Sequence, residues 1–214
     1  FSLVQALDRE ITTLDPDGPE SLSTSAQFAR LARELRLRDR FVEAEQVYMK
    51  LVGIRERSLG SNHPAVGQTL NEIGLFYRQH SKLAAAAGVL TRALSTAEEA
   101  YGAQHAEVAA VAKNLAMVYR DQGRYEVAGP LFRRVVLITE ALVGSKHPDL
   151  AVALKKLGLL YQATGRLDWA ELLLARSLQI NENALDADDL SLSPSLKNLA
   201  GVYMAQDRPA KAAV

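Results

Sequence analysis

The chain has 214 residues, and its 25 basic and 25 acidic side chains give it a formal net charge of zero at pH 7. This balance argues against a generic nucleic-acid-binding protein, which carries an excess of basic residues. Cysteine is absent, which excludes a disulfide framework, a thiolate metal site and a cysteine nucleophile. Hydrophobic residues make up 48% of the chain but aromatic residues only 6%, a composition that favours helices packed through small side chains.

Residues 1–20 form an apolar opening segment. Its apolar side chains stand one period before a later second helix, in a somewhat shifted register, and are Leu3, Val4, Leu7, Ile11 and Leu14. The pattern predicts either the second helix of a preceding repeat or a capping helix, followed by a loop. The segment lacks the basic start and long apolar stretch of a signal peptide, and no run in the chain is long enough to span a membrane. We therefore expect a cytoplasmic protein, with the periplasm as the alternative location.

Four series of residues recur at a fixed interval of 42 residues. The bulky anchors are Leu35, Tyr77, Tyr119, Tyr161 and Tyr203, and the small residues are Ala44, Ala86, Ala128, Ala170 and Ala212. The other two series run through the connecting loops and comprise Gly18, Gly60, Gly102 and Gly144, then His63, His105 and His147. This periodicity predicts a repeat array, with complete units at 21–62, 63–104, 105–146 and 147–188 and an incomplete unit at 189–214.

Each repeat is predicted to contain two antiparallel helices joined by a tight turn. In residues 105–146, apolar side chains at helical spacing mark a first helix that ends near Gly123 and a second that ends near Gly144. At the closest crossing the first helices carry a small residue in every repeat, namely Ala32, Gly74, Ala116, Gly158 and Ala200. Small side chains there allow two helix backbones to approach closely. The sequence therefore predicts an all-α solenoid.

The order of small and bulky residues within a repeat resembles the tetratricopeptide repeat (TPR). It is seen in Gly74, Tyr77, Ala86, Leu90 and Ala93. The interval exceeds the usual TPR length of about 34 residues, and the extra residues between repeats resemble the TPRs of kinesin light chains. HEAT and armadillo arrays have similar periods but lack this order, so they are the minor alternative. The resemblance implies a right-handed superhelical solenoid that acts as a non-catalytic scaffold or adaptor for protein–protein interaction.

No pattern in the sequence indicates an enzyme, because phosphate-binding loops, nucleophile elbows and metalloprotease motifs are absent. The histidines of the fourth series invite interpretation as a metal site. They stand in different repeats, however, separated by roughly 10 Å, whereas zinc needs its nitrogen ligands about 2 Å away. We interpret them as loop ends before a helix, with Pro64 and Pro148 in the first turn. No metal, cofactor or catalytic residue is therefore expected.

The predicted binding surface lies on the first helices, because in TPR arrays these helices line the concave groove. Twenty positions that flank the buried stripe include nine basic residues and one acid, Glu72. This excess predicts a groove that attracts an acidic ligand, and an ordinary solvated helix face is the alternative interpretation. The candidate groove residues are Asn71, Arg78, Lys113, Asn114, Met117, Arg120, Lys155, Lys156, Leu159, Lys197 and Asn198.

Apolar and amide side chains add to this prediction. Leu75, Met117 and Leu159 would form an apolar strip along the same groove. In kinesin light chains, paired asparagines at this place help to bind acidic peptides that contain an aromatic residue. The resemblance carries over in part, because one repeat has Lys155 and Lys156 there. We expect a protein or peptide partner of acidic and apolar character, and we expect neither nucleic-acid binding nor membrane insertion.

Two other functions are compatible with the sequence. The chain starts without methionine and stops inside a repeat, so we expect a fragment of a longer protein. The repeats could then serve as a regulatory segment beside an NTPase or protease domain. Alternatively, exposed terminal helices could associate end to end and make a self-assembling solenoid.

Overall fold

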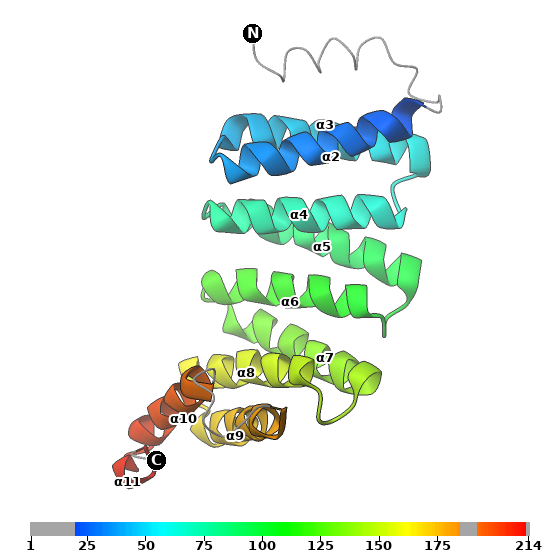
Figure 1. Ribbon diagram of the computed structural model, residues 1–214. Coiled ribbons are helices and arrows are strands. Elements are labelled where there is room, and N and C mark those ends of the chain that lie inside the picture. The colour runs from blue at the N-terminus through cyan, green and yellow to red at the C-terminus, as the bar shows by residue number, and fades with distance from the viewer. Residues whose placement is uncertain (1–19, 185–191, 213–214) are drawn as a thin grey trace. The chain divides into compact units, whose positions relative to one another are not determined.

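The computed structural model describes residues 20–184 and 192–212, which are helical apart from short turns and loops (Figure 1). In chain order the helices are α2 (Glu20–Leu37), α3 (Phe41–Leu59), α4 (Pro64–Gln79), α5 (Leu83–Tyr101), α6 (Ala106–Asp121), α7 (Tyr125–Val143), α8 (Pro148–Ala163), α9 (Leu167–Ala184), α10 (Ser193–Ala205) and α11 (Pro209–Ala212). The predicted all-α fold is confirmed. Contacts divide the chain into two compact units, Phe1–Ala103 with α2 to α5 and Gln104–Val214 with α6 to α11. We call them unit 1 and unit 2.

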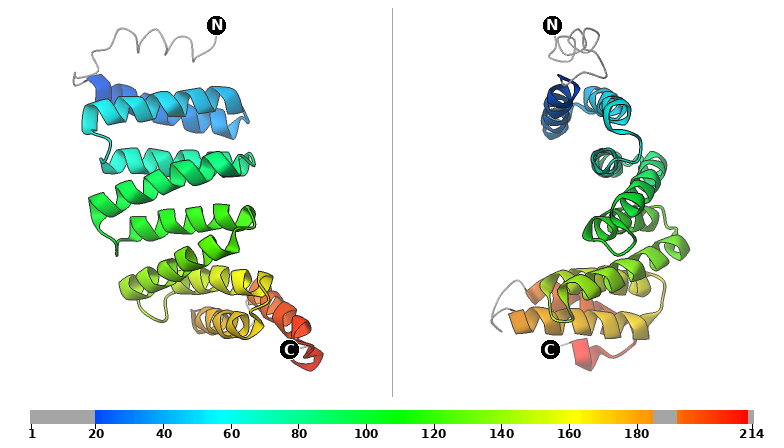
Figure 2. Two further views of the ribbon diagram at one scale, coloured as in Figure 1. Left: turned by 180° about the vertical axis from the view of Figure 1, so that it is seen from behind. Right: turned by 90° about the vertical axis from the view of Figure 1, so that its right-hand side faces the viewer.

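Within each unit the helices pack in antiparallel pairs. In unit 1 the pairs are α2 with α3 and α4 with α5, and in unit 2 they are α6 with α7 and α8 with α9; Figure 2 shows these pairs from two further sides. Helix α10 packs on α9 and on the short α11. Each predicted complete repeat thus holds one helix pair. The prediction for residues 1–20 lies outside the described residues, except that Glu20 begins α2.

A left-handed residue stops the first helix at the same place in every repeat. Two repeats use Gly123 and Gly165, with φ of 73° and 71°, and the others use Asp39, Ser81 and Asp207. The N–H of the following residue donates to the carbonyl of the bulky anchor, for example from Arg124 to Tyr119 at 2.8 Å. This Schellman arrangement satisfies a carbonyl left free at the helix end. The Arg124 guanidinium also lies 4.7 Å from the centre of the Tyr119 ring, so anchor and turn stabilise each other.

The repeated histidines cap the N-termini of first helices. Their Nδ1 atoms each accept a hydrogen bond at 3.2 Å from the N–H two residues on, in the pairs His63–Ala65, His105–Glu107 and His147–Asp149. Pro64 and Pro148 stand in the first turn of α4 and α8. The interpretation of the histidines as loop ends before a helix is confirmed, and the structure adds a capping role, since Nδ1 satisfies an otherwise unpaired N–H.

Four of the five small residues predicted at the helix crossings are buried, and each of these is matched by a larger residue sixteen positions later on the second helix; Ala200 is half-buried. The matched residues are Ala32 with Tyr48, Gly74 with Leu90, Ala116 with Phe132 and Gly158 with Leu174. A β-carbon added to Gly74 would lie 2.3 Å from Leu90 Cγ, and one added to Gly158 would lie 2.8 Å from Leu174 Cγ. Glycine is therefore used where the second helix carries leucine at this position.

Candidate functional site

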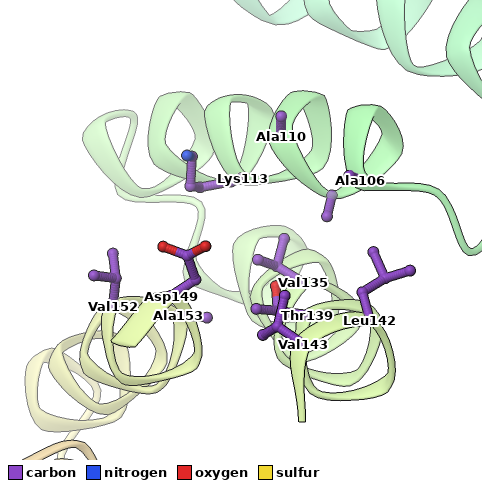
Figure 3. Close-up of a pocket in the computed structure, with 11 residues that line it drawn as sticks. Ala106, Ala110, Lys113, Val135, Thr139, Leu142, Val143, Asp149, Val152 and Ala153 are labelled. Atoms are coloured by element: carbon purple, nitrogen blue, oxygen red, sulfur yellow. The ribbon is translucent and has the colours of Figure 1, made fainter. Parts of the chain in front are cut away.

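A pocket in unit 2 lies among helices α6, α7 and α8 (Figure 3). Its volume is about 280 Å³. Helix α6 contributes Ala106, Ala109, Ala110 and Lys113, helix α7 contributes Val135, Thr139, Leu142 and Val143, and helix α8 contributes Asp149, Val152 and Ala153. Because the lining is mainly aliphatic, the pocket suits an apolar side chain of a ligand.

Short buried side chains form the base of the pocket, and exposed aliphatic side chains form its rim. Ala109, Val135 and Ala153 are buried. Leu142 and Val152 instead expose 51% and 44% of their surface. Together these side chains give the hollow an aliphatic lining that is partly open to water.

Charged side chains stand on two walls of the pocket. Lys113 comes from α6 and Asp149 from α8, so the two lie on opposite sides (Figure 3). Asp149 Oδ2 lies 3.6 Å from Nδ1 of His147, the residue that caps α8. Lys113 forms no ion pair within the described parts of the chain. The His147 Nδ1 accepts a hydrogen bond from the Asp149 N–H, so it carries no proton with which to pair the carboxylate. Lys113 is available to a ligand.

Lys113, Lys155 and Lys197 occupy the same position on three successive first helices, α6, α8 and α10. Like Lys113, the other two form no ion pair among the residues that the structure describes. Lys155 follows the rim residue Val152 by about one helical turn. We call the three residues the lysine row. It gives the first helices of unit 2 three positive charges that no described acid neutralises directly.

Several other basic residues of the predicted surface are paired within the chain. Arg30 lies 3.2 Å from Glu34, Arg33 lies 2.7 Å from Glu72, and Arg120 lies 2.8 Å from Asp121. The hydrogen bond from Arg33 to Glu72, together with the attraction between their charges, raises the pKa of the guanidinium. These pairs reduce the excess of positive charge that the sequence predicted, and they do so mainly in unit 1.

The other predicted groove residues differ in how much surface they offer. Half-buried residues on first helices are Asn71, Arg78, Met117, Lys156, Leu159 and Asn198. Asn114 is only 8% exposed, so it offers little surface to a ligand. Of the eleven candidates, Lys113 lines the pocket.

Sequence reasoning missed the rim residues of the pocket. Leu142 and Val143 belong to the last turn of α7, a second helix, whereas the prediction considered first helices alone. Val152 could have pointed to the pocket, because the equivalent positions in two other repeats hold a polar residue, Gln68, and a small one, Ala110.

Two kinds of feature are absent from the described residues. None of the helices there is long and apolar enough to cross a membrane. No three histidine, cysteine, aspartate or glutamate side chains gather there in a way that could hold a metal ion.

Helix pairs repeated in tandem, with a small residue at each crossing and an open pocket between first helices, define a helical-repeat protein of the interaction type. The sequence matches the tetratricopeptide repeat family over residues 24–99, 82–135 and 107–183. The chain therefore belongs to the tetratricopeptide repeat family, which confirms the resemblance, and it is a scaffold for protein–protein interaction. No curated protein matches it.

Solved structures show the same fold. BtubC (BKLC) from P. vanneervenii is similar with a TM-score of 0.80 and 23% identity, over 98% of this chain and 82% of that one. A kinesin-light-chain-type protein with nearly identical TPR-like repeats from Podosopora anserina gives a TM-score of 0.78 and 24% identity, over 88% and 89% of the two chains. MamA from Desulfovibrio magneticus RS-1 gives 0.66 and 15%, over 92% and 91%. These similarities show that the helical repeats share the fold of those structures.

Proposed function

We propose that unit 2 binds an extended, acidic segment of a partner protein along its first helices. The observation that carries this proposal is the lysine row, three basic groups at one position of α6, α8 and α10 that form no ion pair within the described residues. An extended chain that crosses successive first helices would meet a lysine on each of them. Acidic side chains would be favoured at these places, because an exposed lysine attracts them over several ångströms.

Unit 1 offers a different surface at the same positions. The residues equivalent to the lysine row are Ala29 on α2 and Asn71 on α4. Nearby, the pair between Arg33 and Glu72 joins these two helices and neutralises the charge between them. Acidic ligands are therefore favoured by unit 2 over unit 1.

The pocket beside Lys113 supplies the apolar part of the same site. A ligand side chain in it would contact the rim residues Leu142 and Val152 and the buried base. Burial of one aliphatic side chain stabilises a complex by roughly 1.5–3 kcal/mol. The partner segment favoured by this geometry has an apolar residue flanked by acidic ones.

Charge reversal tests the proposal. In the triple variant Lys113→Glu, Lys155→Glu, Lys197→Glu, we expect an acidic peptide with a central leucine to bind roughly 10- to 100-fold more weakly, because three contacts worth up to about 1 kcal/mol each become repulsive. Fluorescence anisotropy of the labelled peptide measures the dissociation constant. Binding by this variant at the strength of the parent chain would contradict the proposal.

A matched control changes the net charge equally at other surfaces. Arg57 on α3, Arg133 on α7 and Arg38 in the turn after α2 are exposed and are not among the residues that line the pocket. Replacing these three by glutamate should leave most of the affinity in place. Thermal unfolding of both triple variants shows that any loss of binding is not a loss of fold.

A further inference from the structure

We propose that Arg55 closes, in unit 1, the counterpart of the pocket in unit 2, and so restricts the apolar residue of the partner to unit 2. This inference rests on the proposed function and adds the register in which a partner binds. It identifies a residue outside the pocket as a determinant of specificity.

The two regions can be compared residue by residue, because they are two repeats apart. The base of the pocket includes Ala109 on α6, Thr139 on α7 and Ala153 on α8. The residues at the same repeat positions in unit 1 are Ser25 on α2, Arg55 on α3 and Thr69 on α4. At each of the three positions, the side chain in unit 2 is therefore smaller than its counterpart in unit 1 or lacks its polar group.

Arg55 fills its region of unit 1 and bonds to both neighbouring first helices. Its Nε donates to Ser25 Oγ at 3.0 Å, and its Nη1 donates to Thr69 Oγ1 at 2.6 Å and to the Ala65 carbonyl at 2.9 Å. Partial burial lowers the pKa of the guanidinium, but an arginine side chain keeps its charge in proteins. The region is thus closed by the chain's own side chain.

In unit 2 the same region is open and apolar. Thr139 is too short to bridge α6 and α8, and Ala109 and Ala153 carry no acceptor for a guanidinium. An arginine from a partner would lose the side-chain hydrogen bonds that Arg55 makes, so a leucine-sized apolar side chain is the better occupant. Lys113 on the wall places an acidic residue of the partner next to it (Figure 3).

Two reciprocal variants exchange the three residues between the units. The closing variant Ala109→Ser, Thr139→Arg, Ala153→Thr gives unit 2 the residues of unit 1. The opening variant Ser25→Ala, Arg55→Thr, Thr69→Ala gives unit 1 the residues of unit 2. The probe is a labelled acidic peptide with one central leucine, and a second peptide has glycine in place of the leucine.

We expect the closing variant to bind the leucine peptide about tenfold more weakly than the parent chain does. The closing variant should bind the leucine peptide and the glycine peptide with nearly equal affinity. The inference is overturned if the folded closing variant keeps the preference of the parent chain for leucine over glycine. Thermal unfolding establishes the fold of each variant, and the opening variant tests the same idea if the closing variant does not fold.

A small apolar probe separates this inference from the proposed function. N-acetyl-leucinamide should shift the methyl signals of Ala106 and Ala110 in the parent chain, and those of Ala26 and Ala29 only in the opening variant. These shifts are expected even if no acidic peptide binds, an outcome that would refute the proposed function alone. Absence of shifts at Ala106 and Ala110, or equal shifts at Ala26 in the parent chain, would refute the role of Arg55.

Discussion

Replacing Gly74 with alanine is expected to lower the free energy of unfolding by roughly 1–3 kcal/mol. The sign of this change is informative, because replacing glycine by alanine inside a helix otherwise stabilises the helix by about 1 kcal/mol. Gly74 lies at the crossing of α4 and α5, where a β-carbon would lie 2.3 Å from Leu90 Cγ and 2.6 Å from its Cδ2. Since Leu90 is itself fully buried, the clash must be relieved by moving one helix.

Gly88 provides the matched control on the neighbouring helix. It also lies within a helix, α5, but it is exposed and a β-carbon there would meet no atom within 4 Å. Gly88→Ala should therefore stabilise the chain by roughly 0.5–1 kcal/mol. The double variant Gly74→Ala, Leu90→Phe copies the residues Ala116 and Phe132 of the next repeat and should recover part of the loss. Urea unfolding measures all three, and a stabilising Gly74→Ala would contradict the packing described.

Replacing Tyr48 with phenylalanine is expected to stabilise the chain by roughly 1–3 kcal/mol. Tyr48 is fully buried, and its hydroxyl has no hydrogen-bond partner among the described residues. Burial is the main reason why the pKa of this phenol is raised. The equivalent positions hold Leu90, Phe132 and Leu174, so the repeat accepts an apolar residue there. The change removes the cost of burying an unpaired hydroxyl and leaves the ring packing intact.

Tyr77 is the contrasting case. Burial and a hydrogen bond to Glu45 raise the pKa of Tyr77 to about 12. Tyr77→Phe loses that bond and should cost roughly 1–2 kcal/mol. Urea unfolding at neutral pH therefore should give opposite signs for the two tyrosines. Destabilisation by Tyr48→Phe equal to that by Tyr77→Phe would show that the Tyr48 hydroxyl has a partner.

The fold could be predicted from the sequence because its causes are local and recur in every repeat. A helix must stop where a left-handed residue such as Gly123 follows the anchor Tyr119, and helices can cross closely only where Gly74 or Ala116 provides space. Each signal is weak alone, but its repetition at a fixed interval makes it strong. The capping role of the histidines was missed, because His is not among the common N-cap residues.

The candidate site was predicted in part. The basic character of the first helices was visible, and the lysine row lies within it. The partners Glu34 and Asp121 were missed because they lie just outside the positions considered. The pocket could not be predicted, since it depends on which side chain is short, Thr139, where another repeat has Arg55. The difference between threonine and arginine indicates a pocket only when the three helices around it are known to lie side by side.

The most direct measurement is the dissociation constant of the 214-residue chain for an acidic peptide with one central leucine. The control is a basic peptide in which lysine replaces each acidic residue. Both peptides are measured at about 50 and about 200 mM NaCl. We predict that the acidic peptide binds more tightly than the basic one, and that its affinity falls roughly three- to tenfold at the higher salt concentration, because salt screens the lysine row. Equal binding of the two peptides, or binding of the acidic peptide that salt does not weaken, would contradict the assignment of an acidic partner to unit 2.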